Sequence, residues 1–176
     1  MKKLNIRQLA VTGILTALVF TSSWIMIPIS TGIDNTRIHL GNVLCLLSGL
    51  LMGGWLGGLA AGLGSAIFDL TNPLYIAYAP FTLILKFFIG FIAGKIAYAR
   101  DSRGLNTRRN IIGSIIASLT YSVLYLIESF FINRIVYLLT PEAAFLALTP
   151  KVAATLINAL IACIIAVPLA AGIRAA

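Results

Sequence analysis

The sequence predicts an all-α integral membrane protein with six transmembrane helices and both termini in the cytoplasm. Of the 176 residues, 60% are hydrophobic and 10% are charged, whereas a soluble domain usually carries about 25% charged residues. So few charged side chains cannot cover a water-soluble globule. Six apolar runs are interpreted as membrane helices, although the second and third are short, and the basic residues gather on one predicted side. The length fits one membrane domain, residues 1–176.

Six apolar runs define the predicted helices in chain order. Their approximate bounds are 7–29, 40–53, 55–70, 80–99, 110–138 and 146–172. About 20 apolar residues span a bilayer as a helix. The first run has the basic start of a signal peptide, but no A-x-A-like cleavage site closes it, so we expect a retained helix. Only Gly53 and Gly54 separate the second and third runs. Because polar residues flank this pair of runs, we expect a hairpin of two spans.

Basic residues set the predicted orientation, because cytoplasmic segments carry an excess of Lys and Arg. With the N-terminus inside, the cytoplasmic side receives Lys2, Lys3, Arg7, Lys95, Arg100, Arg103, Arg108, Arg109 and Arg174. Asp101 is the one acid expected there. The other four acids fall in the outer half, at Asp34, Asp69, Glu128 and Glu142.

Glycine recurs at helical spacing in the third run. Gly54, Gly58 and Gly62 form one stripe of small residues, and a second contains Gly57, Ala61 and Ser65. Such stripes allow helix backbones to approach closely. Two interpretations stay open: internal packing, or a docking surface for another membrane subunit. The first run carries a similar pattern at Ala10, Gly13 and Ala17.

Ionisable residues in the outer half are the main indication of a binding site. The cytoplasmic charge bias does not explain Asp34, Arg37, His39, Asp69, Lys86, Glu128, Arg134 and Lys151. A charge inside a span costs a few kcal/mol or more, so such residues usually face a cavity or pair with one another. Because several spans bring them to a similar depth, we predict a ligand pocket that opens outward.

Helical spacing extends the predicted pocket. Tyr121, Tyr125 and Glu128 share one face of the fifth run. Lys151, Thr155 and Asn158 repeat that spacing on the sixth run, and Thr82 lies one turn outward of Lys86 on the fourth. Aromatic walls with a few polar groups are usual for small-molecule sites. The alternative is a structural ion pair, such as Lys86 with Glu128. Arg134 is expected near the membrane interface rather than at a ligand.

The external segment 30–42 contains Arg37, His39 and Asn42, and it could cover the pocket from one side. Tyr75 and Tyr78 could cover it from the other. A lone histidine does not make a metal site, so we expect His39 to form hydrogen bonds and predict no metal. Cys45 and Cys163 lie in apolar runs and are expected to be reduced core residues.

Several motifs are absent from the sequence. It has no Walker A, HExxH or GxSxG motif, so a nucleotide site, a metalloprotease and a serine hydrolase are not expected. No cofactor and no nucleic-acid partner are predicted. Two interpretations of other classes stay open: a small membrane enzyme with Glu128 or Asp69 as base, and a ligand-free assembly subunit.

Two stretches of the sequence resemble a known family. The stretch TRIHLGNVLCLLSGLLMGGWLGGLAAGLGSAIFDL, residues 36–70, and the stretch YAPFTLILKFFIGFIAG, residues 78–94, are similar to the S components of energy-coupling factor (ECF) transporters. The small residues at Ala10, Gly13 and Ala17 add to the likeness, although Gly13 stands where the family usually has alanine. These stretches look like the branch of S components for hydroxymethylpyrimidine, pyridoxine or pantothenate.

The resemblance implies a substrate-binding subunit of a vitamin importer in a bacterial cell membrane, without enzymatic activity. Such a subunit captures its vitamin outside and docks, through the small residues of its first helix, on a membrane coupling subunit (T component) driven by two cytoplasmic ATPases. A ring compound would use Glu128 and Asn158 for hydrogen bonds and the tyrosines for stacking. Pantothenate would need Arg37, Lys86 or Lys151 for its carboxylate.

Overall fold

The computed structural model describes residues 5–30 and 35–175. Its helices are α1 (Ile6–Ser23), α2 (Gly41–Met52), α3 (Gly54–Thr71), α4 (Ala79–Ala97), α5 (Thr107–Ile135), α6 (Pro141–Leu146) and α7 (Thr149–Ala175). A hairpin of strands β1 (Met26–Ser30) and β2 (Asn35–His39) follows α1, and two short 3-10 turns, η1 (Ile76–Tyr78) and η2 (Ala99–Asp101), flank α4. The predicted Asp34, Lys2 and Lys3 lie outside the described residues.

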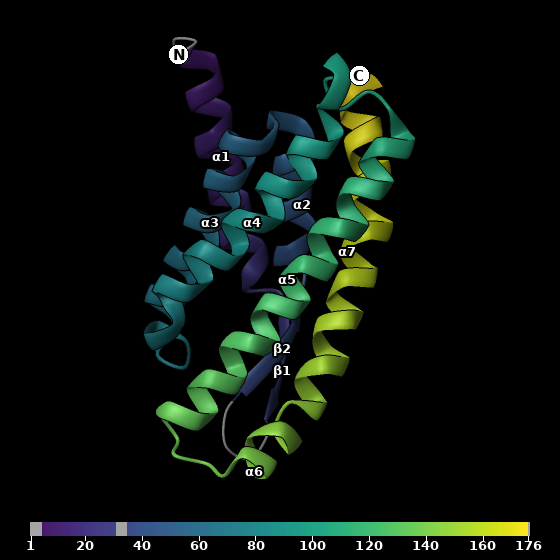
Figure 1. The fold of residues 1–176 in the computed structure, drawn as a ribbon. Helices are drawn as coiled ribbons and strands as arrows, with labels where there is room; N and C mark the ends of the chain where they lie inside the picture. The colour runs from purple at the N-terminus through teal and green to yellow at the C-terminus, as the bar shows by residue number, and fades with distance from the viewer. Residues whose placement is uncertain (1–4, 31–34, 176) are drawn as a thin grey trace.

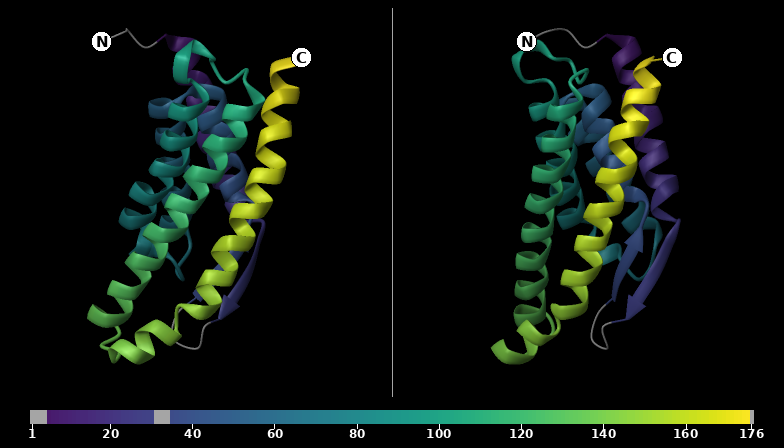
Figure 2. Two further views of the ribbon diagram at one scale, coloured as in Figure 1. Left: turned by 45° about the vertical axis from the view of Figure 1, so that its right-hand side comes forward. Right: turned by 90° about the vertical axis from the view of Figure 1, so that its right-hand side faces the viewer.

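The helices form an elongated bundle, with both termini at one end and α6 at the other (Figure 1). We call these the terminal end and the α6 end. The long helices α5 and α7 run side by side along the bundle, and Figure 2 shows the hairpin beside α7. By length and composition, four helical stretches of the described residues could each cross a bilayer, namely Ile6–Ser23, Ile76–Ala97, Thr107–Ile135 and Pro141–Ala175. The count of six spans stays a prediction.

The bounds of the five later helices agree with the predicted runs within three residues. The prediction for the first run is wrong at its end, because α1 stops at Ser23 and β1 begins at Met26. Pro28 lies in β1, opposite Arg37 of β2. A proline inside a helix removes one backbone hydrogen bond and clashes with the preceding turn, so Pro28 favours the end of α1 before it. The fold is therefore a helical bundle with one β-hairpin, and α6 is a further short helix that the apolar runs did not predict.

Glycines hold the centre of the bundle together where α2, α3 and α4 meet. A Cβ at Gly49 would strike the carbonyl of Gly90, one at Gly90 would strike the carbonyl of Gly57, and one at Gly57 would strike Gly49. The stripe that contains Gly54 and Gly58 likewise faces the backbone and side chains of α4. Of the two interpretations, the glycine stripes of α3 therefore serve internal packing.

The second and third runs form two separate helices joined by a tight turn, as predicted, whereas their crossing of the membrane stays a prediction. α2 and α3 are joined by Gly53 alone, whose φ of 79° lies in the left-handed region that favours glycine. The Ser48 hydroxyl donates to the Gly57 carbonyl at 2.8 Å across this joint. α2 also packs against α4, and Asn42 of α2 contacts Lys86 of α4, as described below.

Candidate functional site

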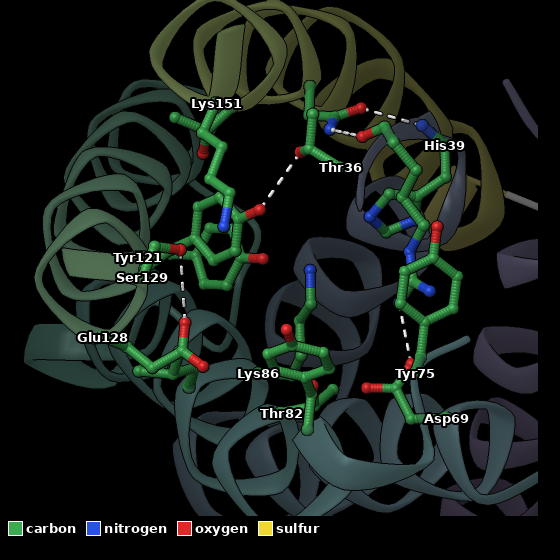
Figure 3. A pocket seen from close by; sticks show the side chains of 16 residues that line it. Thr36, His39, Asp69, Tyr75, Thr82, Lys86, Tyr121, Glu128, Ser129 and Lys151 are labelled. Carbon is green, nitrogen blue, oxygen red and sulfur yellow. Dashed lines mark hydrogen bonds and ion pairs between the residues drawn. The ribbon is translucent and has the colours of Figure 1, made fainter. Parts of the chain in front are cut away.

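A cavity lies among β2, α4, α5 and α7 in the half of the bundle toward the α6 end (Figure 3). Its lining consists of Thr36, Arg37, His39, Asp69, Tyr75, Tyr78, Thr82, Leu85, Lys86, Tyr121, Tyr125, Glu128, Ser129, Lys151, Thr155 and Asn158. Only Leu85 among these has a purely aliphatic side chain. Such a polar lining inside a chain with 60% hydrophobic residues is chemically suited to a polar ligand.

Arg37 is held on one side of the cavity by a buried ion pair and two aromatic rings. Its Nη2 lies 2.9 Å from Oδ1 of Asp69, which is 1% exposed. The guanidinium carbon lies 4.5 Å from the ring centre of Phe68 and 4.0 Å from that of Tyr75. Its Nη1 is buried and has no hydrogen-bond partner among the described residues. Arg37 therefore keeps one donor group for a ligand or a water molecule.

Lys86 enters the cavity from α4, although its side chain is only 2% exposed. Its ammonium donates to Oδ1 of Asn42 and lies 4.0 Å from the ring centre of Tyr121. An ammonium carries three donors, and no carboxylate lies within ion-pair distance of Lys86 in the described part of the chain. The ammonium therefore has donors left for a ligand.

The wall formed by α5 consists mainly of two stacked rings. The ring centres of Tyr121 and Tyr125 lie 5.9 Å apart and their planes differ by 11°. The Tyr125 hydroxyl lies 3.1 Å from that of Thr36 on β2, which ties the hairpin to α5. One turn further along α5, Ser129 donates to Glu128 at 3.5 Å. This wall offers flat aromatic surface beside a carboxylate.

Lys151 reaches the cavity from α7, opposite Lys86, and Figure 3 shows both ammonium groups directed toward its centre. The side chain is 2% exposed, and its ammonium lies 5.9 Å from the ring centre of Tyr125. One turn along α7, the Thr155 hydroxyl lies 3.0 Å from that of Ser122 on α5. The cavity is thus lined by cations from three elements and by the carboxylates of Asp69 and Glu128.

Asn158 has a structural role that the sequence did not predict. Its Oδ1 accepts the backbone N–H of His39 at 2.9 Å, and its Nδ2 donates to the carbonyl of Arg37 at 2.8 Å. The amide thus pairs with β2 in the way that a neighbouring strand would. One N–H of the amide is left for a ligand.

His39 is buried and takes part in local hydrogen bonding. Its Nδ1 accepts the backbone N–H of Gly41 at 3.1 Å, which requires Nδ1 to be unprotonated. Burial, together with the positive charges of Lys86 and Arg37, lowers the pKa of His39 well below its usual range. The described residues contain no cluster of three or more His, Cys, Asp or Glu side chains that could hold a metal ion.

Most of the predicted binding residues lie together around this cavity, namely Arg37, His39, Tyr78, Lys86, Tyr121, Tyr125, Glu128, Lys151 and Asn158. Asn42 lies behind the lining and contacts Lys86. The ion pair considered for Lys86 and Glu128 is not formed, because Lys86 bonds to Asn42 instead. Arg134 lies outside the lining, exposed, and donates to the carbonyl of Leu139.

Three lining residues were not anticipated: Thr36, Leu85 and Ser129. Ser129 follows Tyr125 by four positions on the same helix, so helical spacing could have indicated it. Thr36 and Leu85 carry no such signal. On α1, the residues Ala10, Gly13 and Ala17 are exposed, and a Cβ at Gly13 would meet no atom within 4 Å. Their role in docking stays a prediction.

The cavity is small, at about 70 Å³. In a comparable measure a single water molecule needs about 10–15 Å³. The space therefore accommodates several water molecules, and a larger ligand would require the lining side chains to move.

Comparison with known proteins identifies the family of the chain that forms this polar cavity. The family described as "ECF-type riboflavin transporter, S component" matches residues 3–175. The chain belongs to this family. This S component is therefore a subunit of a membrane transporter rather than an enzyme, and ECF S components work with a T component and ATPases. The branch for hydroxymethylpyrimidine, pyridoxine or pantothenate is not distinguished by this match.

The S component is also similar to a protein of Pyrococcus woesei described as "Uncharacterized protein in gap 3'region". The two are 30% identical over 112 residues, which cover 63% of this chain and 73% of the relative. That description assigns no ligand. The choice of substrate therefore depends on the chemistry of the cavity.

Proposed function

We propose that this S component captures a small vitamin or vitamin precursor with a single ring, of the hydroxymethylpyrimidine or pyridoxine kind, and delivers it into the cell. With both termini in the cytoplasm, the α6 end faces outward and the cavity lies in the outer half. Docking on the T component through Ala10, Gly13 and Ala17 would couple the bound vitamin to ATP hydrolysis.

The observation that carries this proposal is the α5 wall. Tyr121 and Tyr125 present stacked rings, and aromatic pairs contribute about 0.5–1.5 kcal/mol beyond the area they bury. Glu128 lies beside them and can accept a hydrogen bond from a hydroxymethyl or amino group. Lys86 can donate to a ring nitrogen or hydroxyl. A single ring with hydroxyl or amino substituents is complementary to all three groups.

Cavity size supports a small ring over a large one. The name of the matched family mentions riboflavin, whose three fused rings are larger than a pyrimidine or pyridine. From a cavity of about 70 Å³, a single-ring compound requires less movement of the lining side chains than a three-ring ligand does.

Pantothenate is the second candidate, and the cations favour it. Nη1 of Arg37 is buried and unpartnered among the described residues, and Lys86 has no carboxylate within ion-pair distance there. A carboxylate ligand would form charge-assisted hydrogen bonds with these donors. Pantothenate has no ring, so it would leave the stacked tyrosines without a matching surface.

Thermal unfolding of the purified protein in detergent tests the proposal against hydroxymethylpyrimidine, pyridoxine, pantothenate and riboflavin. A ligand at 100 times its Kd stabilises the folded state by about 2.7 kcal/mol, so a true substrate raises Tm measurably. We expect one of the ring precursors to raise Tm, and Glu128→Gln to weaken this effect while the exposed Glu142→Gln does not.

Each alternative has a distinct outcome in the same measurement. A shift with pantothenate alone would support the second candidate. A shift with riboflavin alone would show that the size argument is wrong. No shift with any vitamin, and no vitamin in a mass spectrum of the purified protein, would contradict the binding function and favour the assembly subunit.

A further inference from the structure

A second hollow lies on the outside of the bundle, between α5, α6 and α7 near the α6 end. It measures about 700 Å³ and is almost entirely apolar. Its lining includes Ile127, Phe130 and Phe131 of α5, Phe145 of α6, and Val152 and Ala153 of α7. We call it the α5–α7 groove. The rings of Phe130 and Phe145 meet edge to face with centres 5.6 Å apart, so α6 helps to shape it.

The groove and the polar cavity lie on different faces of the same two helices. On α5, Ile127 lines the groove and the next residue, Glu128, lines the cavity. On α7, Val152 lines the groove and the preceding residue, Lys151, lines the cavity. The groove is therefore separate from the proposed vitamin site, but whatever fills it contacts the helices that carry Glu128 and Lys151.

The groove faces the bilayer, and a cation marks its outer side. Ile127 and Phe131 are 49% and 55% exposed, so in a membrane protein they face lipid chains. Arg134 follows Phe130 by four positions and Phe131 by three, which brings it to the same side of α5, one turn closer to the α6 end. Its guanidinium donates to the Leu139 carbonyl, and its other donors are available.

We propose that the α5–α7 groove binds one acyl chain of an anionic phospholipid of the surrounding bilayer, whose phosphate is held by Arg134. A lipid chain in the groove restores dispersion contacts that the side chains around an empty hollow would lack. A flexible chain fits a narrow apolar hollow between two helices. Arginine at the level of the headgroups provides charge and paired donors for a phosphate. The lipid thereby fills the space between α5 and α7 from outside.

Native mass spectrometry of the delipidated protein, titrated with dioleoyl phosphatidylglycerol or dioleoyl phosphatidylcholine, tests this proposal. We expect one retained phosphatidylglycerol, bound about fivefold better than phosphatidylcholine, the value typical of one basic side chain at an anionic headgroup. Arg134→Gln should remove this preference. Ala153→Phe, which fills the exposed groove, should lower retention of both lipids about tenfold through lost apolar contact.

Two matched variants serve as controls. Arg108→Gln removes an exposed arginine at the other end of α5, and Ala171→Phe adds a ring to an exposed position of α7 outside the groove. Both should retain lipid as the parent protein does, and gel filtration checks that all four variants remain folded. Equal retention of the two lipids, equal effects in the control variants, unchanged retention in Ala153→Phe, or a second protein copy in place of the lipid would each overturn the proposal.

Discussion

The pair Arg37–Asp69 gives the sharpest test of how the polar cavity is held. At 2.9 Å and an effective dielectric constant of about 20, the gross attraction of two unit charges is about 6 kcal/mol. Desolvation offsets much of it, so removing one partner from a buried pair costs about 3–5 kcal/mol, whereas replacing both costs far less. We therefore expect Asp69→Asn and Arg37→Met each to lower the free energy of unfolding by about 3 kcal/mol.

The double variant Arg37→Met with Asp69→Asn should lower the free energy of unfolding by clearly less than the sum of the two single variants, because neither charge is then left buried alone. Unfolding by SDS in mixed micelles measures these values. Tryptophan fluorescence is a suitable signal, since the Trp24 ring lies 5.0 Å from that of Phe68, which packs on Arg37. The exposed Asp101→Asn is the control, with an expected change within about 0.5 kcal/mol. Strictly additive losses would refute the reasoning.

Three further predictions concern the helix contacts, His39 and docking. Gly90→Ala should destabilise the protein by about 1–3 kcal/mol through overpacking, whereas Gly172→Ala, with no atom within 4 Å of its Cβ, should not; equal unfolding curves in SDS would contradict the packing described for α2, α3 and α4. His39 is neutral in the folded protein and protonates at about pH 6.5 in the unfolded chain, so a fall in pH stabilises the unfolded chain. Between pH 7.5 and 5.5 the free energy of unfolding of the parent protein should therefore fall by about 1.4 kcal/mol more than that of His39→Gln. Parallel pH profiles of unfolding would show that His39 is not responsible. Gly13→Leu should leave vitamin binding unchanged and abolish uptake in reconstituted vesicles, and normal uptake would remove the docking role.

Most of the helices could be predicted from the sequence because a membrane allows few alternatives. A backbone in hydrocarbon must satisfy its own hydrogen bonds, so a long apolar run is helical even where glycine is frequent. The β-hairpin escaped prediction for the same reason, since Met26–Ser30 is as apolar as the helix before it. Pro28 was the local sign of the change. The hydroxyls of Ser22 and Ser23, which bond to the carbonyl of Val19 at 3.0 and 2.8 Å, mark the end of α1.

The cavity could be predicted in outline because burying charge is costly. That cost indicated that Arg37, Lys86 and Lys151 would lie inward, and all three line the cavity. Their individual partners could not be predicted. Asp69 pairs with Arg37 across 32 positions of sequence, and Lys86 bonds to Asn42 where α4 packs against α2. Such choices depend on distances that periodicity does not contain.

Two hydrogen bonds between Asn158 and β2 link the C-terminal helix α7 directly to the hairpin. Both involve the Asn158 amide, which lies in the first half of α7, and the other end of α7 lies at the terminal end of the bundle. A rotation of α7 would therefore also move β2, whose residues Thr36, Arg37 and His39 line the polar cavity. A displacement at the terminal end of α7 would reach the cavity along this one helix, through the amide of Asn158.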